Sequence, residues 1–294
     1  MLQAPPVNRA GSFQEALAAM QRLQRRDGPE ILTQARSALL HHGARTPLAL
    51  VLLHGFTNHP GQFREFAPLA HARGLNVLIP RLPGHGDRDR LTKRLAHLTA
   101  PALIERASQA LDIACGLGER VCVAGISSSG LLAAYFAQYR ADVQHGVVIA
   151  PEFAILDFSY ALSQATAAAM RVLPNAFLWW DPRVKNGMHP LTAYPRFPTH
   201  ALAQTLRIAA DVRTASKRTS IRAARIDVVM NVNDPAVNNA ATAAVVRDWN
   251  ARKAGCAFAH ALGGLPRNHD IIEPDNPKAR TDLVYPQLLE IVAR

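Results

Sequence analysis

The sequence has few cysteines and no long apolar segment, and we expect no signal peptide. Its three cysteines, Cys115, Cys122 and Cys256, are odd in number and match no metal-ligand spacing. They therefore predict reduced thiols rather than a disulfide framework or a zinc site. No run reaches the roughly 18 apolar residues that a membrane-spanning helix needs. The first residues also lack the basic start and apolar block of a signal peptide. We expect a cytoplasmic protein that uses no metal and no cofactor.

Acidic residues are outnumbered by basic ones, which gives a formal net charge of +11. Such a balance can attract phosphates, membranes or acidic substrates. The sequence has no zinc-finger spacing and no aromatic residues between the basic ones, so it predicts no nucleic-acid partner. We interpret the clusters as solvated helix faces, with docking on a membrane surface as the alternative. The basic residues gather in 81–94 and at Arg213, Lys217, Arg218, Arg222 and Arg225.

Short apolar runs alternate with segments of helical periodicity from residue 47 onward. A continuous apolar run such as 48–53 suits a strand that is covered on both faces of a parallel sheet. Strand–helix alternation of this kind indicates right-handed crossovers. The sequence therefore predicts an α/β fold with a doubly wound, mostly parallel sheet and helices on both faces. The expected strands cover 48–53, 75–80, 120–125, 146–150, 226–232 and 257–262.

The alternation divides the chain into three parts. Residues 1–46 form an N-terminal helical extension, in which Ser12 and Glu15 can cap a helix packed on the core. Residues 35–41 fit an edge strand or a second helix equally well. Residues 47–150 and 223–294 form the α/β core. Residues 151–222 show helical stretches and no clear strand, so we expect a helical cap or lid over one edge of the sheet.

The candidate nucleophile is Ser127, which stands where the chain turns from the strand at 120–125 into a helix. A serine on such a turn holds its hydroxyl in front of a substrate, and the turn is strained. Gly125 supplies the small residue that the turn requires two positions earlier. Ser129 stands where a second glycine is expected, and restoring that glycine should keep activity. Ser128 and Ser129 are weaker nucleophile candidates.

A serine hydroxyl needs a base, and the base needs an acid that orients it. In α/β sheets such partners follow the carboxyl ends of later strands. Asp234 and His269 stand at those positions. The order Ser127, Asp234, His269 matches the chain order of serine, acid and histidine that is typical of catalytic triads on this type of sheet. Asp234 could instead cap the next helix, and His269 could be an ordinary loop histidine. Asp227 lies at the wrong end of its strand, and Asp270 is better suited to orienting the loop.

An acyl-transfer transition state carries a negative oxygen that backbone N–H groups stabilise. The expected oxyanion donors are the N–H groups of Phe56 and Ser128, with Gly55 allowing close approach of the substrate. A plain turn at the strand end is the alternative for His54-Gly55. Trp179 and Trp180 in the expected cap could contact an acyl chain, or could simply form the core of the cap.

Five motifs in this order resemble those of the α/β-hydrolase superfamily, and more narrowly those of bacterial carboxylesterases and monoacylglycerol-lipase-like enzymes. The resemblance covers roughly residues 47–294 and implies Ser127 as nucleophile, Asp234 as acid and His269 as base. It also implies Phe56 and Ser128 as oxyanion donors and a helical cap. Ser129 departs from the family pattern. The motifs are His54-Gly55-Phe56-Thr57, Leu82-Pro83-Gly84-His85-Gly86, Gly125-Ile126-Ser127-Ser128-Ser129-Gly130, Asn233-Asp234-Pro235-Ala236-Val237 and His269-Asp270-Ile271-Ile272-Glu273-Pro274.

We therefore expect a serine hydrolase that cleaves short- to medium-chain acyl esters or monoacylglycerol-like lipids through an acyl-enzyme on Ser127. The same apparatus can hydrolyse thioester, amide, lactone or carbon–carbon bonds, and the fold does not choose among them. A non-catalytic binding protein on this fold is a further alternative. That alternative predicts a missing triad member, and the sequence has all three.

Overall fold

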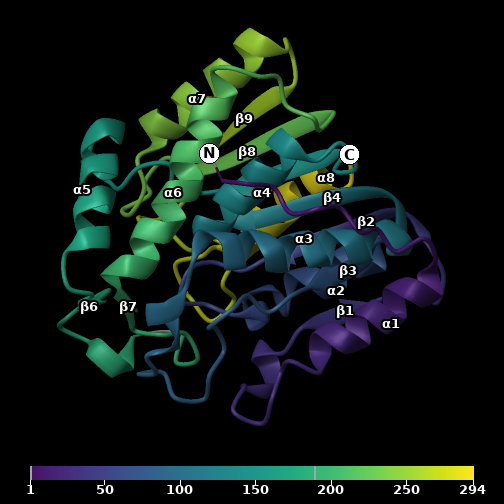
Figure 1. The fold of residues 1–294 in the computed structure, drawn as a ribbon, viewed down its shortest axis with the longest axis horizontal. Helices are drawn as coiled ribbons and strands as arrows, with labels where there is room; N and C mark the ends of the chain where they lie inside the picture. The colour runs from purple at the N-terminus through teal and green to yellow at the C-terminus, as the bar shows by residue number, and fades with distance from the viewer. Residues whose placement is uncertain (1, 189) are drawn as a thin grey trace.

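The computed structural model describes residues 2–188 and 190–294. Its centre is a seven-stranded sheet in the order β1-β3-β2-β4-β5-β8-β9, in which β1 is antiparallel to β3 and the other neighbours are parallel (Figure 1). This is the doubly wound, mostly parallel sheet that the sequence predicts. The strands are β1 (Ala38–Leu40), β2 (Thr46–Leu53), β3 (Asn76–Ile79), β4 (Gly118–Ile126), β5 (His145–Ile149), β8 (Arg225–Asn231) and β9 (Ala257–Leu262).

Alternate residues of the buried strands supply two separate hydrophobic cores. In β2, Leu50 and Leu52 pack into one core, whereas Val51 and Leu53 pack into the other. Successive side chains of a strand point to opposite faces, so a strand covered on both sides must be apolar throughout. The continuous apolar run at 48–53 thus follows from its central place in the sheet.

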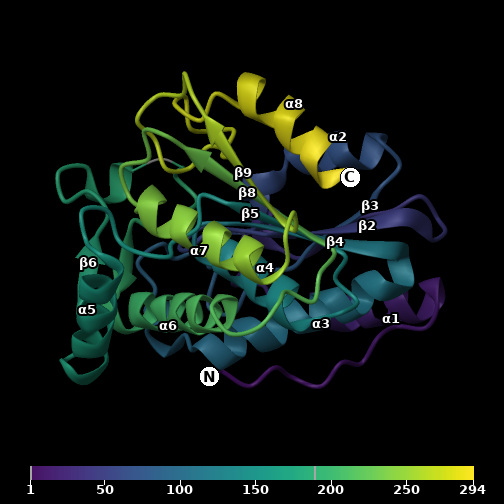
Figure 2. The same cartoon turned by 90° about the horizontal axis from the view of Figure 1, so that it is seen from above.

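Helices cover both faces of this sheet (Figure 2). The core on one face contains residues of α2 and α8, and the core on the other face contains residues of α3, α4, α6 and α7. The first helix, α1, packs against α3 on the outside. The helices are α1 (Phe13–Gln24), α2 (Phe66–Ala72), α3 (Ala100–Leu117), α4 (Ser128–Tyr139), α6 (Thr199–Ser216), α7 (Asn239–Arg252) and α8 (Thr281–Val292).

The N-terminal part contains both a helix and a strand. Ser12 caps α1, because its Oγ accepts a hydrogen bond from the N–H of Glu15 at 3.2 Å. The carboxylate of Glu15 accepts in return from the N–H of Gly11 at 2.7 Å. Residues 38–40, for which the sequence left two possibilities, form the edge strand β1.

The segment between β5 and β8 differs in part from its expected helical character. It contains helix α5 (Tyr160–Val172), but also an antiparallel pair of short strands, β6 (Phe177–Trp179) and β7 (Arg196–Pro198). The expectation that this segment holds no strand is therefore wrong. Three-residue strands are too short to show a periodicity in the sequence. Figures 1 and 2 show α5 and the β6–β7 pair at one end of the molecule.

Helix α6 belongs to the same hydrophobic core as the central helices. Its residues Leu206, Ala209 and Val212 are fully buried in the core that also contains α3 and α4. Helix α6 lies within the expected cap at 151–222 and is part of this core. Among the described residues, no helix has the length and the apolar character that crossing a membrane requires.

Candidate active site

The turn from β4 into α4 carries Ser127 in a strained backbone conformation. Its φ of 60° and ψ of −121° lie in a region that residues with a side chain rarely adopt. A hydrogen bond from the N–H of Ser127 to the carbonyl of Ile149, at 2.8 Å, holds the turn against β5. Gly125 must lack a side chain, because a Cβ atom there would approach the carbonyl oxygen of Ser129 to 2.1 Å. The structure thus explains why a glycine precedes the expected nucleophile.

The structure brings Ser127, His269 and Asp234 together from positions up to 142 residues apart in the chain. The Nε2 atom of His269 lies 2.8 Å from the Oγ of Ser127, and its Nδ1 lies 2.8 Å from the Oδ2 of Asp234. Asp234 follows β8, and His269 follows β9 in the loop that leads to α8. This is the relay of nucleophile, base and acid that nucleophilic catalysis by serine needs.

The loop that carries Asp234 is held by backbone and side-chain hydrogen bonds. The Oδ1 of Asp234 accepts from the N–H groups of Ala236 and Val237, at 2.8 and 3.2 Å. Asn231, at the end of β8, donates through its amide to the carbonyls of Pro266 and Asn268. The second of these carbonyls belongs to the residue before His269, so Asn231 fixes the acid loop and the base loop relative to each other.

The electrostatic surroundings of His269 favour its protonated form. Burial works to lower the pKa of the imidazole, but the hydrogen bond and the charge of Asp234 outweigh it, and Asp270 and Glu152 add to the effect. The pKa of His269 is therefore raised above its ordinary value. A histidine held in this way can accept a proton from Ser127 and carry the resulting charge beside a carboxylate.

The expected oxyanion donors are the backbone N–H groups of two residues that follow strands of the sheet. Phe56 follows β2, and Ser128 is the first residue of α4. Within the part of the chain that the structure describes, neither N–H group has a protein hydrogen-bond partner. Free donors at a loop and at a helix N-terminus are suited to binding a developing negative charge.

Side chains hold the peptide unit between His54 and Gly55, one unit before the N–H of Phe56, from both sides. The hydroxyl of Ser129 donates to the carbonyl of His54 at 2.5 Å. The N–H of Gly55, in the same peptide unit, donates to the Oε1 of Gln62 at 2.8 Å. The residue that departs from the family pattern therefore forms a hydrogen bond that a glycine cannot form.

Gln62 also connects this loop to the loop that carries His269. Its Nε2 donates to the Oδ2 of Asp270 at 2.6 Å, and the Oδ1 of Asp270 accepts from the N–H groups of Ile272 and Glu273. Asp270 therefore orients the loop, as the sequence predicts. Burial raises the pKa of Asp270 above its usual range, and burial together with the charge of Asp270 raises the pKa of Glu273 to about 7.

A cavity of about 640 Å³ opens in front of Ser127 and His269. Trp180 lines it and donates through its indole N–H to the Oγ1 of Thr57 at 2.9 Å. Trp179, also expected near the substrate, is not among the lining residues, and the guanidinium of Arg196 lies 5.8 Å from its ring centroid. Of the two tryptophans, only Trp180, the first residue after β6, therefore lines the cavity.

Sequence reasoning missed Gln62, Asn231 and Glu152 as residues near the site. Glu152 lines the cavity in front of Ser127, two residues after an expected strand ends at position 150. That place at the carboxyl end of a strand was the available signal for Glu152. Gln62 and Asn231 gave no comparable signal, because they act through backbone groups of distant loops. No group of three or more His, Cys, Asp or Glu suited to a metal ion occurs among residues 2–188 and 190–294.

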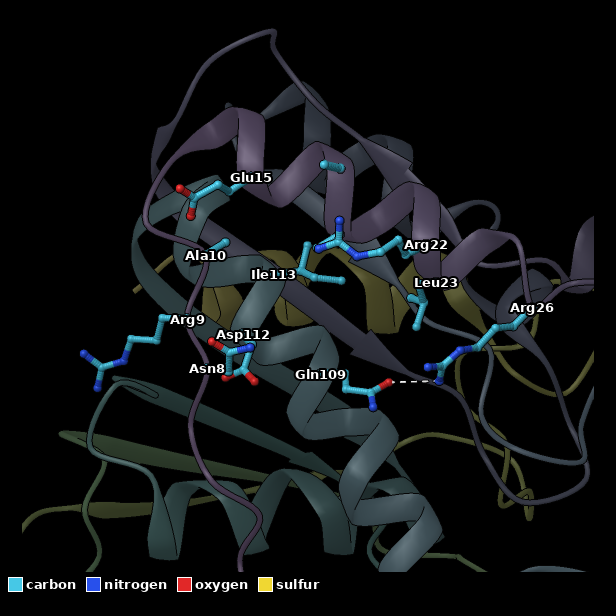
Figure 3. Close-up of a pocket in the computed structure, with 12 residues that line it drawn as sticks. Asn8, Arg9, Ala10, Glu15, Arg22, Leu23, Arg26, Gln109, Asp112 and Ile113 are labelled. Atoms are coloured by element: carbon cyan, nitrogen blue, oxygen red, sulfur yellow. Dashed lines mark hydrogen bonds between the residues drawn. The ribbon is translucent and has the colours of Figure 1, made fainter.

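A second cavity, of about 470 Å³, lies between α1 and α3 (Figure 3). Arg26 of the segment after α1 donates there to the Oε1 of Gln109 on α3 at 3.2 Å. The other charged lining residues carry both signs, and none of the predicted site residues lines this cavity. Of the predicted site residues, Phe56, Ser127, Trp180 and His269 line the first cavity instead. The charged side chains of the second are Arg9, Glu15, Arg22, Arg26 and Asp112.

Comparison with known proteins places these observations in a family. The sequence profile described as "Alpha/beta hydrolase family" matches residues 50–279. A thermostable monoacylglycerol lipase from Bacillus sp. (strain H-257) is 28% identical over 172 residues, which is 58% of this chain and 66% of that enzyme's length. The chain thus spans slightly less than two thirds of that relative.

Two solved structures share the fold. One, reported for LipS and LipT, two metagenome-derived lipolytic enzymes, has a TM-score of 0.68 and 19% identity over 90% of this chain and 99% of that chain. The other is the monoacylglycerol lipase of Paleococcus ferrophilus, with a TM-score of 0.68 and 17% identity over 87% of this chain and 98% of that chain. At such identities, the likeness is one of fold.

Proposed function

Because the chain belongs to the alpha/beta hydrolase family, we propose that it is a serine hydrolase that cleaves carboxylic esters. The observation that carries this proposal is the continuous relay from Asp234 through His269 to Ser127, with 2.8 Å at each step. The strained backbone of Ser127 supports the same chemistry, as do the N–H groups of Phe56 and Ser128, which have no protein partner among the described residues. The Bacillus relative, named as a monoacylglycerol lipase, supports an ester substrate.

The proposed reaction proceeds through an acyl-enzyme. The Oγ of Ser127 attacks the ester carbonyl while the Nε2 of His269 takes its proton, and Asp234 stabilises the imidazolium. The N–H groups of Phe56 and Ser128 bind the oxyanion of the tetrahedral intermediate. As the C–O bond to the alcohol breaks, His269 returns the proton to the leaving oxygen. A water molecule, deprotonated by His269, then attacks the acyl carbon and releases the acid, and Ser127 regains its proton.

The cavity supports an acyl chain of short to medium length. Its walls include the apolar side chains of Phe56, Ile155, Leu156, Trp180 and Leu202. Apolar walls with a few placed polar groups are typical of sites for small ligands. We propose short- to medium-chain acyl esters and monoacylglycerol-like lipids as the substrates. The segment with α5, β6 and β7, which supplies Trp180, is the proposed cap over the site.

Hydrolysis with a series of p-nitrophenyl esters of increasing chain length tests this function. Wild-type protein should release p-nitrophenol and should react with a fluorophosphonate probe at Ser127. The Ser127→Ala variant should lose both reactions while it keeps the thermal unfolding profile of the wild type. Full activity in that variant would refute the assignment of the nucleophile, and a wild type that the probe does not label would favour a binding protein.

The same relay would serve for thioester, amide, lactone or carbon–carbon bonds, and these remain the alternatives. A parallel screen with one substrate of each class distinguishes them. The three cysteines are free in the structure, which fits the proposed cytoplasmic location. A weak contact with anionic membranes through the basic surface is a secondary proposal. Co-sedimentation with liposomes that depends neither on the salt concentration nor on the content of anionic lipid would argue against this contact.

A further inference from the structure

Glu152 is a buried carboxyl group inside the cavity that contains Ser127 and His269. Only 9% of the residue is exposed. Within the described part of the chain, no cation lies within ion-pair distance of its carboxyl oxygens. Burying an unpaired charge is costly, so a carboxyl group in this place favours its neutral form. Burial accordingly raises the pKa of Glu152 to about 7, against smaller opposing effects from Thr205 and His269.

The contacts of the Thr205 hydroxyl indicate to which atom protonated Glu152 donates a hydrogen bond. Its Oγ1 lies 2.8 Å from the carbonyl of Leu202 and 3.1 Å from the Oε2 of Glu152. A hydroxyl has one proton to donate, and the shorter contact takes it. In its neutral form, Glu152 then donates its own proton through Oε2 to Thr205. The hydrogen bonds run in one direction, from Glu152 to Thr205 and on to Leu202.

This arrangement leaves the second oxygen of Glu152 as an acceptor. Its Oε1 has no hydrogen-bond partner among the described residues. This oxygen is not fully buried, so it is open to the cavity. Of the residues that line the same cavity, Ile155, Leu156 and Leu202 are apolar and offer no side-chain donor. A substrate group that satisfies Oε1 must therefore donate a hydrogen bond. Ether oxygens, carbonyl oxygens and alkyl groups cannot do so.

We propose that Glu152 determines specificity by accepting a hydrogen bond from a hydroxyl group of the ester substrate. The hydroxyl can belong to the alcohol part, as in an ester of a polyol, or to the acyl chain, as in a hydroxy acid. This inference rests on the proposed ester hydrolysis and adds the substrate class. The site prefers hydroxylated esters over plain esters of the same length.

Three decanoate esters distinguish these possibilities: methyl decanoate, monodecanoylglycerol and methyl hydroxydecanoate. The first has no hydroxyl, the second has hydroxyls in the alcohol part, and the third has one in the acyl chain. The readout is the ratio of kcat/KM for each hydroxylated ester to kcat/KM for methyl decanoate. This ratio should fall about 10-fold in Glu152→Leu, because the bond to the hydroxyl is lost. The ester whose ratio falls identifies the part of the substrate that Glu152 contacts.

Glu152→Gln is the matched control. Its amide can donate to Thr205 and still present an acceptor oxygen to the cavity, so the ratio should stay within about twofold of the wild type. Thr205→Val against Thr205→Ser gives a second test should Glu152→Leu not fold. Valine removes the group that orients Glu152 and should lower the ratio, whereas serine should keep it.

Unchanged ratios in Glu152→Leu, or in Thr205→Val where the former does not fold, would overturn the role of Glu152. With wild-type turnover of methyl decanoate, that result leaves the proposed ester hydrolysis intact. No turnover of any of the three esters by the wild type would instead refute the proposed function, and this inference with it.

Discussion

Replacing Ser129 by alanine tests how the molecule positions the N–H of Phe56, the proposed oxyanion donor. The substitution removes the hydroxyl that donates to the carbonyl of His54 at 2.5 Å, and both residues are fully buried. The N–H at the other end of the same peptide unit stays bonded to Gln62 at 2.8 Å. The variant therefore loses one of the two side-chain bonds that hold this unit.

The expected losses follow from the two hydrogen bonds. Removing one buried hydrogen bond and leaving its carbonyl partner without that donor costs about 2 kcal/mol of the free energy of unfolding. For a chain of this size, that loss lowers Tm by about 4 °C. Loss of an entire oxyanion donor lowers kcat by about 10²–10³-fold. Because Gln62 still holds the unit, Ser129→Ala should lower kcat by less than about 10-fold.

The assay is steady-state hydrolysis of a p-nitrophenyl ester by Ser129→Ala, Gln62→Leu and the double variant. The double variant frees the peptide unit on both sides, so its kcat should fall by more than the product of the single effects, towards about 100-fold. KM should change little, since the oxyanion forms only on the way to the transition state. A Ser129→Ala variant as inactive as Ser127→Ala would refute this reasoning, as would a double variant that raises KM alone. Ser129→Gly should also stay active, with about 1 kcal/mol of further destabilisation from glycine in a helix.

Three further predictions concern pH and the strained turn. Only a neutral imidazole can accept the proton of Ser127, and the pKa of His269 is raised above 6.5. The value of kcat/KM should therefore rise with pH, with an apparent pKa above 6.5. A kcat/KM that stays constant from about pH 5 to about pH 9 would contradict this prediction. The folded-state pKa of Glu152, about 7 against an ordinary 4.5, means that the folded protein keeps a proton that the unfolded chain releases, so stability falls as pH rises through this window. Glutamine does not titrate, so the free energy of unfolding of Glu152→Gln should rise relative to that of the wild type by up to about 3 kcal/mol from about pH 4 to about pH 8, as measured by urea unfolding. The same difference between variant and wild type at both pH values would contradict this prediction. Gly125→Ala places a Cβ atom 2.1 Å from the carbonyl oxygen of Ser129 and should cost more than about 3 kcal/mol, whereas a wild-type Tm would show that the turn can relax.

The amino-acid sequence by itself determined the features that depend on neighbouring residues. Apolar runs bounded by turn residues predicted the central strands, because a strand covered on both faces must be apolar along its length. The small residue at Gly125 and the serine at position 127 predicted the strained turn. The positions of Ser127, Asp234 and His269 after three parallel strands, β4, β8 and β9, predicted that the three would meet, since parallel strands end at the same edge of a sheet.

Only the tertiary structure decided the contacts between segments that are far apart in the chain. Ser129 bonds to a carbonyl 75 positions away, Gln62 to a carboxylate 208 positions away, and Glu152 to a hydroxyl 53 positions away. No local pattern encodes such pairs, because each depends on how the loops close over the sheet. The same holds for Trp180, which lines the cavity, while its neighbour Trp179 does not. The sequence thus identified the proposed catalytic groups, whereas folding determined what positions them and which substrate groups they can meet.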